Sequence, residues 1–360
     1  MVPRFFKGIH WPIVFLMLAL AALGIIEIYS ATFQDGSSFA SKQFFWFLAG
    51  LVIFFLTIGI GYRTFLNFSY LIYGFTVILL FWVLFFAKAR SGAHSWLALG
   101  PFQIQPSEFS KIATTLMLAH FLADRSAFFA QKRTLMTVMF LMAFPCLLVL
   151  KQPDLGTALV FIPMFLGMIF LWGVRFRYLF VLFSLALASA PFLWHVLKPY
   201  QQKRILVFMN PSIDPIGASY TAIQSKIAVG SGGLFGKGWL HGTQTQLDFV
   251  PEHHTDFIFS VFAEEFGFLG TLLLLLLFSV LIGYAFQIMK HTTDLKARLL
   301  VAGVIAAFAF QAFVNIGMTI GIAPITGVTL PFMSYGGSSL VASFFAFGLL
   351  VSIYKERSIF

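Results

Sequence analysis

The sequence predicts an all-α integral membrane protein with about ten transmembrane helices. Hydrophobic residues make up 59% of the chain and charged residues only 10%, and the mean hydropathy is +0.91. This balance leaves too few polar groups to cover a water-soluble surface. Apolar stretches long enough to cross a hydrocarbon core recur along the whole chain, and basic residues gather in alternate connections between them. Residues 1–360 are therefore expected to form one polytopic membrane domain.

Ten apolar segments are the expected transmembrane helices, because most of them approach the roughly 20 helical residues that a bilayer requires. In chain order they are 11–31, 44–60, 68–87, 107–123, 135–150, 157–172, 178–197, 257–286, 299–320 and 339–354. A hydrophilic segment, 198–256, separates the seventh from the eighth. It is expected to form one large loop outside the membrane.

The Lys and Arg residues predict the orientation, because short loops that contain them stay in the cytoplasm. One set of connections and both termini contain most of them. The short loops on the opposite side contain only Lys42, Lys88, Arg90 and Lys151. Both termini are therefore expected in the cytoplasm, with the loop 198–256 outside. The net charge of +10 reflects this asymmetry and attraction to anionic lipids, so it does not indicate a nucleic-acid partner.

The fourth apolar segment begins with a pair of charged residues. Pro106 and Ser107 mark a helix start, and Glu108 and Lys111 follow three residues apart, where they can pair on one helix face. An ionisable side chain at membrane depth is costly unless it is paired or hydrated. Two interpretations stay open: a structural ion pair that fixes helix packing, or a cation that is held for an anionic substrate and tuned by the acid.

Two further acidic residues border apolar segments. Asp154 precedes the sixth segment, where capping of the helix N-terminus is its ordinary role and support of a functional site is the alternative. Glu27 lies near the outer end of the first segment. It is either hydrated at the interface or paired with a base that the sequence does not identify.

The large loop interleaves polar and apolar residues, unlike a simple linker. It contains the adjacent cations Lys203 and Arg204, and the spacing of residues 220–228 predicts a short amphipathic helix on the membrane surface.

A glycine cluster, 230–238, includes Lys237 and resembles a loop that cradles a phosphate. It does not match the nucleotide-binding P-loop, because Ser231 and Gly238 stand where that motif requires Gly and Ser or Thr. A turn between short helices is the alternative.

Asp256, at the end of the large loop, is the candidate general base. Ser260 and Glu264 follow at i+4 and i+8, so the three side chains lie close to one helix face. A partly desolvated carboxylate at the mouth of a membrane cavity is expected to have a raised pKa, which suits proton abstraction. A helix N-cap is the alternative role.

Asp256 also belongs to a group of acidic residues and histidines that contains Glu252, His253 and His254. Adjacent histidines rarely bind one ion, and the spacing matches no zinc motif. No metal site is therefore assigned to these residues. Whether the protein uses a divalent cation, Mg²⁺ or Mn²⁺, as a cofactor stays open.

The segment after the ninth helix, 321–339, is rich in glycine and contains Ser334. Irregular backbone near a membrane is tolerated only where protein encloses it or where it lines a watery cavity. It is therefore expected to border the same cavity as Asp256.

Short motifs in a fixed order carry a resemblance over essentially the whole chain. They are Gln105-Pro106-Ser107-Glu108 with Lys111, Gln152-Pro153-Asp154-Leu155-Gly156-Thr157, Arg204 with Asn210-Pro211 and Asp214-Pro215, Gln224-Ser225, Ser231-Gly232-Gly233, Gly236-Lys237-Gly238, Gly242-Thr243-Gln244, Pro251-Glu252, Thr255-Asp256-Phe257-Ile258-Phe259, Glu264-Glu265-Phe266-Gly267 and Pro331-Phe332-Met333-Ser334-Tyr335-Gly336-Gly337. In these motifs the sequence resembles the SEDS family (shape, elongation, division and sporulation). Lys237 and residues 242–244 are more similar to its RodA members than to its FtsW members.

The resemblance implies a ten-helix peptidoglycan glycosyltransferase in the bacterial cytoplasmic membrane. Such an enzyme polymerises lipid II at the outer face for cell elongation and rod shape, together with a class B penicillin-binding protein and the elongation machinery. The family's essential aspartate corresponds to Asp256.

On this basis Asp256 is expected to take the proton of the acceptor hydroxyl as it attacks the donor's anomeric carbon with inversion. Lys111 and Arg204 are the expected contacts of the pyrophosphate leaving group, with Lys203, Lys226 or Lys237 as assistants. The other substrate-side candidates are Glu108, Lys203, Lys237 and Ser334, and the supporting candidates are Asp154, Ser260 and Glu264.

Two other functions compete with this one. Many helices, buried charges and broken backbone also suit a lipid II flippase, although the polar residues cluster on one side and no inverted repeat is evident. A non-catalytic scaffold that activates a penicillin-binding protein is the third possibility, and it predicts that substitution of Asp256 leaves polymerisation unchanged.

Overall fold

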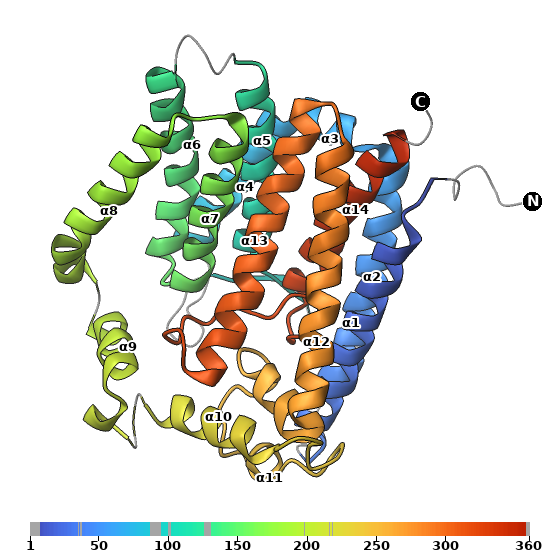
Figure 1. Ribbon diagram of the computed structural model, residues 1–360, viewed down its shortest axis with the longest axis vertical. Helices are drawn as coiled ribbons and strands as arrows, with labels where there is room; N and C mark the ends of the chain where they lie inside the picture. The colour runs from blue at the N-terminus through green and yellow to red at the C-terminus, as the bar shows by residue number, and fades with distance from the viewer. Residues whose placement is uncertain are drawn as a thin grey trace, which may run out of the picture.

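Long helices that run roughly alongside one another form the body of the computed structural model (Figure 1). The structure describes residues 8–34, 36, 38–86, 95–99, 102–125, 131–197, 199–215, 217 and 219–357. Lys88 and Arg90, which contributed to the predicted orientation, lie outside these residues. Both chain ends lie at one end of the bundle, and the short helices of the large loop lie at the other (Figure 1).

The ten predicted transmembrane helices are all present. They are α1 (Trp11–Ala31), α2 (Phe39–Ile60), α4 (Ser69–Phe86), α5 (Pro106–Ala123), α6 (Gln131–Lys151), α7 (Leu155–Trp172), α8 (Phe176–Val196), α12 (Ile258–His291), α13 (Leu295–Ile320) and α14 (Gly337–Arg357). Within the described residues, eight helices are both long and apolar enough to span a membrane, and α5 and α8 complete the set. The chain is a multi-pass membrane protein.

Helix α5, which contains the Glu108–Lys111 pair, lies at the centre of the bundle. It packs against α4, α6, α7, α13 and α14, and nearly all of its side chains are buried. Peripheral helices instead expose large apolar side chains; Phe85 on α4, for example, is 71% exposed. Polar residues are therefore kept inside the protein and apolar residues face the lipid.

Small residues let neighbouring helices approach closely, as is typical of membrane proteins. Helix α14 packs along α2, where a Cβ at Gly50 would lie only 2.5 Å from the Phe344 ring. On α1, a Cβ at Gly24 would lie 2.6 Å from the Cα of Met333. These contacts fix the positions of α1, α2 and α14 around the irregular segment that precedes α14.

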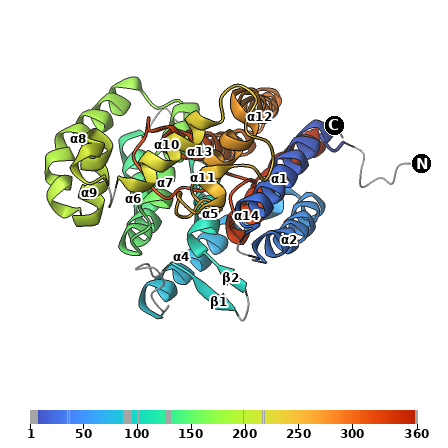
Figure 2. The ribbon, with the colours of Figure 1, turned by 90° about the horizontal axis from the view of Figure 1, so that it is seen from below.

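Short elements complete the chain. The short helices are α3 (Tyr62–Asn67), α9 (Pro199–Met209), η2 (Pro211–Ile213), α10 (Tyr220–Ser231) and α11 (Thr243–Gln246). Helix α10 confirms the predicted short helix, and it packs against α12 and α13. An antiparallel hairpin that the sequence analysis did not predict, β1 (Leu97–Leu99) and β2 (Phe102–Ile104), lies beside α4 and α5 (Figure 2).

The glycine cluster of the large loop docks into a break in α12. Gly267 interrupts this helix with φ 64° and ψ −162°, a conformation that favours glycine. The N–H of Phe268 donates to the Gly233 carbonyl (2.8 Å), and the N–H of Lys237 donates to the Glu264 carbonyl (3.0 Å). Loop and helix therefore share backbone hydrogen bonds at this point, which holds the loop against the end of the bundle.

Candidate active site

The Asp256 side chain lies where the large loop joins α12, against the irregular segment 321–339. A Cβ at Gly327 would lie 3.4 Å from Asp256 Oδ2. The Asn315 side chain on α13 donates to the carbonyls of Asp256 (2.8 Å) and Val328 (2.7 Å). The irregular segment therefore borders Asp256, as the sequence predicts, and Asn315 holds the two segments in register.

Asp256 does not cap α12. The N-cap residue is Phe257, and it makes no side-chain capping bond. The Asp256 carboxylate receives no hydrogen bond from any residue that the structure describes, whereas a capping carboxylate would accept one or more backbone N–H groups. The capping alternative is therefore wrong for this residue.

Burial, together with the nearby Glu252 carboxylate, raises the pKa of Asp256 to about 6. The positive charge of Arg204 opposes this shift, and Asp154 adds to it. A carboxyl group with this pKa is ionised near neutral pH and still accepts a proton readily, as a general base must.

Arg204, whose charge acts on this carboxyl group, lines one small cavity together with Lys226. Arg204 projects from α9 and Lys226 from α10, and the cavity of about 20 Å³ is closed by segment 321–325. The Arg204 guanidinium donates weakly to the Ile325 carbonyl (3.4 Å), while Gly321 leaves room for the Lys226 side chain. Two cations on one cavity form a site that favours an anion.

Two other candidate cations form ion pairs. Lys203 Nζ lies 2.6 Å from Asp214, and Lys237 Nζ lies 2.6 Å from Glu264. Glu264 is fully buried and also accepts from the N–H of Gln244 (2.9 Å) and the hydroxyl of Thr245 (2.9 Å). Glu264 and Lys237 therefore fasten the loop to α12.

Three backbone N–H groups at the end of the glycine cluster are already occupied. Those of Lys237 and Gly238 donate to the Glu264 and Glu265 carbonyls (3.0 Å each), and that of Gly236 donates to Gly232 (2.8 Å). A phosphate cradle needs several N–H groups that point at the anion. The cluster therefore docks on α12 as a turn, and these three N–H groups do not point at an anion.

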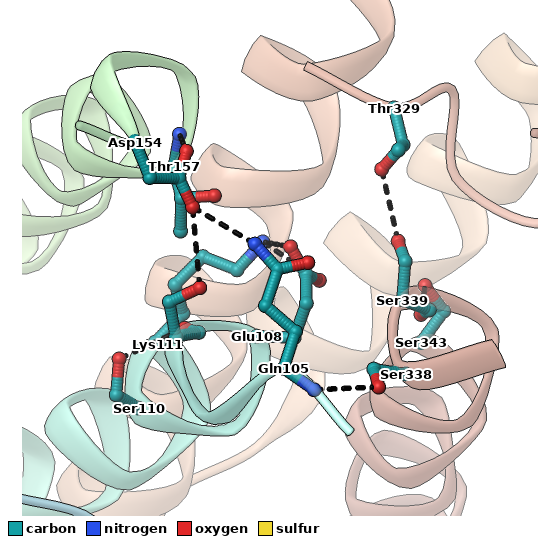
Figure 3. Close-up of polar contacts among 11 residues, drawn as sticks. Gln105, Glu108, Ser110, Lys111, Asp154, Thr157, Thr329, Ser338, Ser339 and Ser343 are labelled. Carbon is teal, nitrogen blue, oxygen red and sulfur yellow. Dashed lines mark hydrogen bonds and ion pairs between the residues drawn. The ribbon is translucent and has the colours of Figure 1, made fainter. Parts of the chain in front are cut away.

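A second polar cluster joins α5 to α7 in the interior (Figure 3). Lys111 Nζ lies 3.0 Å from both Glu108 oxygens, and the two side chains are each only 7% exposed. Together they line a cavity of about 40 Å³ between α5, α13 and α14, enough for a water molecule. The ion pair predicted from the sequence is confirmed, with its charges facing this cavity.

Asp154 caps α7, because its carboxylate accepts from the Thr157 N–H (3.0 Å). It also accepts from Gln105 Nε2 (2.9 Å) and the Ser107 hydroxyl (3.3 Å) on the α5 side (Figure 3). Burial raises the pKa of Asp154, whereas the Thr157 hydrogen bond lowers it. Asp154 therefore joins α5 to α7. Its negative charge also raises the pKa of Asp256.

Two serines named from the sequence fix the backbone. Ser334 Oγ accepts from the Leu330 N–H (2.8 Å), and the Ser334 carbonyl accepts from Gln43 on α2 (3.2 Å). Ser260 Oγ donates to the Phe257 carbonyl (2.6 Å) in the first turn of α12. Both side chains are buried, and these bonds support the two segments that surround Asp256.

His253 fastens the loop to α1. Its Nδ1 lies 2.8 Å from the Val250 carbonyl and its Nε2 lies 2.8 Å from the Ala31 carbonyl. Nδ1 also lies 3.8 Å from Asp248 Oδ1. Both nitrogens are thus engaged, and the described residues contain no group of three or more His, Cys, Asp or Glu arranged to hold a metal.

Asn315 and His253 are the functional residues that the sequence analysis did not assign. Asn315 is a lone amide within an apolar helix, which is itself a signal because buried amides need partners. His253 was assessed only as a metal ligand, and its carbonyl partners are set by the turn of the loop and the end of α1.

The fold and site define a class of proteins: ten-helix membrane proteins with a partly buried carboxyl group near the cations of the outer loop. The family model FTSW_RODA_SPOVE, described as cell cycle protein, matches residues 10–359. The chain belongs to this family.

Two relatives align over nearly the whole chain. The peptidoglycan glycosyltransferase MrdB of Escherichia coli strain K12 is 41% identical over 343 residues, covering 95% of this chain and 92% of MrdB. The peptidoglycan glycosyltransferase RodA of Treponema pallidum strain Nichols is 35% identical over 417 aligned positions, covering 95% and 96%.

Solved structures share the fold. A chain from a peptidoglycan synthase complex that coordinates polymerization and crosslinking has a TM-score of 0.85 at 34% identity, covering 98% of this chain and 99% of that one. An aspartate-to-alanine mutant of the Thermus thermophilus rod shape determining protein RodA has a TM-score of 0.75 at 32% identity, covering 98% and 99%.

Proposed function

We propose that this chain is a peptidoglycan glycosyltransferase that polymerises lipid II in the bacterial cytoplasmic membrane. One observation carries the proposal: Asp256 is a partly buried carboxyl group with a pKa of about 6 and no hydrogen-bond donor among the described residues, and the cation Arg204 acts on it electrostatically. The 41% identity to a named peptidoglycan glycosyltransferase supports the same reaction.

The reaction at Asp256 is a displacement with inversion. The carboxylate takes the proton of the acceptor's sugar hydroxyl, whose oxygen bonds to the anomeric carbon of the donor. The bond between that carbon and the polyprenyl pyrophosphate breaks, and the leaving group departs with its electron pair. Asp256 then returns its proton to water, which restores the carboxylate for the next addition.

The leaving group's charge is neutralised by Arg204 and Lys226 in the cavity that they share. Lys111, with Glu108, is the second candidate contact, because its ammonium group faces a cavity in the interior. Lys203 and Lys237 are assigned to holding the loop, since each is paired with a carboxylate. A divalent cation, Mg²⁺ or Mn²⁺, would be brought by the pyrophosphate, with Asp154 and Asp256 as the nearby carboxylates.

The enzyme faces outward at its loop end, where α9, α10 and α11 lie, and both termini are cytoplasmic. The distribution of Lys and Arg supports this orientation. The partner is a class B penicillin-binding protein of the cell-elongation machinery. The likeness to a chain of a synthase complex that couples polymerization to crosslinking supports this partner.

The test is glycan polymerisation from purified lipid II by reconstituted protein, with a partner whose transpeptidase serine is mutated. Wild type is expected to make polymer, while Asp256→Asn and Asp256→Ala make none although they fold and bind the partner. The matched control is Asp248→Asn in the same loop: the Asp248 side chain is 64% exposed, its φ of 55° suits asparagine, and asparagine keeps the Oδ1 that lies 3.8 Å from His253 Nδ1. Normal polymerisation by the Asp256 variants contradicts the mechanism, and the same preparations then enter a lipid-flipping assay.

A further inference from the structure

The loop end of α1 holds the segment that leads to Asp256. The carbonyl of Ser30 accepts from Gln246 Nε2 (2.9 Å), and the carbonyl of Ala31 contacts His253 Nε2 (2.8 Å). The Ser30 hydroxyl donates to Glu265 on α12. Three separate contacts therefore tie this turn of α1 to the loop and to α12.

A buried carboxyl pair lies at the same point. Glu27 is one helical turn before Ser30 on α1, and its exposed fraction is 0%. Neither Glu27 oxygen has a hydrogen-bond partner within the described residues, and the same holds for Oε2 of Glu265. Glu265 is the charged group that acts electrostatically on Glu27. Three carboxylate oxygens in one buried place thus lack a hydrogen donor.

The surrounding charges do not compensate this pair. Glu264, the nearest acid on α12, adds negative charge, and its own cation Lys237 is engaged by it at 2.6 Å. The Leu240 N–H and His241 act on Glu265 from the loop, and His253 contacts two carbonyls and the exposed Asp248 rather than this pair. Two facing carboxylates without a cation cannot both stay ionised at membrane depth, because desolvation and mutual repulsion oppose it.

We propose that Glu27 and Glu265 bind one proton between them and that this proton fastens α1 to α12 beside the catalytic loop. The proton resides on Glu27, whose hydroxyl then donates to Oε2 of Glu265, while the other Glu265 oxygen keeps its bond from Ser30. A metal ion is a poor occupant, since Mg²⁺ and Ca²⁺ take about six or more oxygen ligands. This site is separate from the reaction at Asp256 and does not depend on it.

Infrared difference spectroscopy of the full chain in nanodiscs tests the site at about pH 8, where ordinary carboxyl groups are ionised. Wild type minus Glu27→Gln is expected to show one protonated-carboxyl band. The control Asp124→Asn removes a carboxylate that pairs with Lys296 at 2.7 Å, so its difference spectrum is expected to lack that band. Absence of the band in the Glu27→Gln difference overturns the proposal.

Two further arms keep the test decisive. Glu265→Gln changes the acceptor of the Glu27 hydroxyl, so the band is expected to shift in frequency and to remain; an unshifted band overturns the pairing even if Glu27→Gln fails to fold. Replacing sodium by choline and adding a chelator of divalent ions is expected to leave the band unchanged. A band that appears only after this removal shows that a metal ion occupies the site and overturns the proton assignment.

Discussion

Asp154 and Asp256 each precede a transmembrane helix, in a turn next to Pro or Thr. Their carboxylates nevertheless have different partners and different roles. Asp154 accepts three hydrogen bonds and joins α5 to α7. Asp256 accepts none from the described residues, and the charge of Arg204, which lines a cavity with Lys226, acts on it. The residue type and its position before a helix are the same, so the difference lies in the partners: a saturated carboxylate holds structure, and an unsaturated one is available for chemistry.

Replacing Arg204 gives the largest expected effect among the cations. Arg204→Ala removes positive charge from the cavity that it shares with Lys226 and should lower the polymerisation rate about 100-fold, as loss of one electrostatic contact to a developing charge does. Lys203→Ala is the neighbouring control, because the Lys203 side chain is 54% exposed and paired with Asp214. Equal losses in the two variants would contradict the assignment of Arg204.

The pH dependence of the rate should follow Asp256. Because the base must be ionised, the rate is expected to fall about tenfold per pH unit below the pKa of about 6 and to be level above it. Burial raises this pKa above the unfolded value, so protonation stabilises the folded protein: the gain is complete below the unfolded pKa of 3.8 and is lost as the pH rises through about 6. Rates measured from purified lipid II across this range check the first expectation, and a level profile contradicts it.

Asn315→Ala should have a smaller effect on rate. It removes the donor to the Asp256 and Val328 carbonyls, at 2.8 and 2.7 Å, so the catalytic segment loses its register with segment 321–339. We expect about a tenfold lower rate and a loss of about 1–3 kcal/mol in stability, since a buried carbonyl is left unsatisfied. Polymerisation and thermal unfolding measure the two effects. An unchanged polymerisation rate would show that Asn315 does not position the Asp256 segment for catalysis.

Thr157→Ala tests the structural role of Asp154, whose carboxylate accepts several hydrogen bonds. Its expected effect is the smallest. The substitution leaves the N–H that Asp154 accepts at 3.0 Å and removes a side chain that is 8% exposed and also hydrogen-bonds to Asp154. A stability loss of about 1 kcal/mol with little change in rate is expected. A large loss of rate with unchanged stability would show that the α5–α7 cluster takes part in chemistry.

Most of the fold follows from the sequence, because length and hydropathy determine which segments cross a membrane. All ten predicted segments are helices, and α1 (Trp11–Ala31) begins and ends as predicted. The break at Gly267 was not predicted, since one glycine in an apolar run carries no sign of the loop that docks there. The hairpin of β1 and β2 is likewise too short to leave a periodic pattern.

The site was predictable only in part. Asp256 stands out because an acid precedes an apolar helix, and the pairing of Glu108 with Lys111 follows from helical spacing. The pairing of Lys237 with Glu264 joins residues far apart in the chain, so only the folded loop reveals it. The same holds for Asn315, whose partners come from two different loops.

The central claim is that Asp256 performs chemistry and Asp154 holds structure. The most direct test compares polymerisation rate and thermal unfolding for Asp256→Asn and Asp154→Asn. The account predicts that Asp256→Asn loses polymerisation by about 100-fold or more with its unfolding temperature unchanged or raised. Asp154→Asn should lower the unfolding temperature and keep measurable polymerisation, since asparagine still caps a helix. Full polymerisation by a well-folded Asp256→Asn protein would contradict the account.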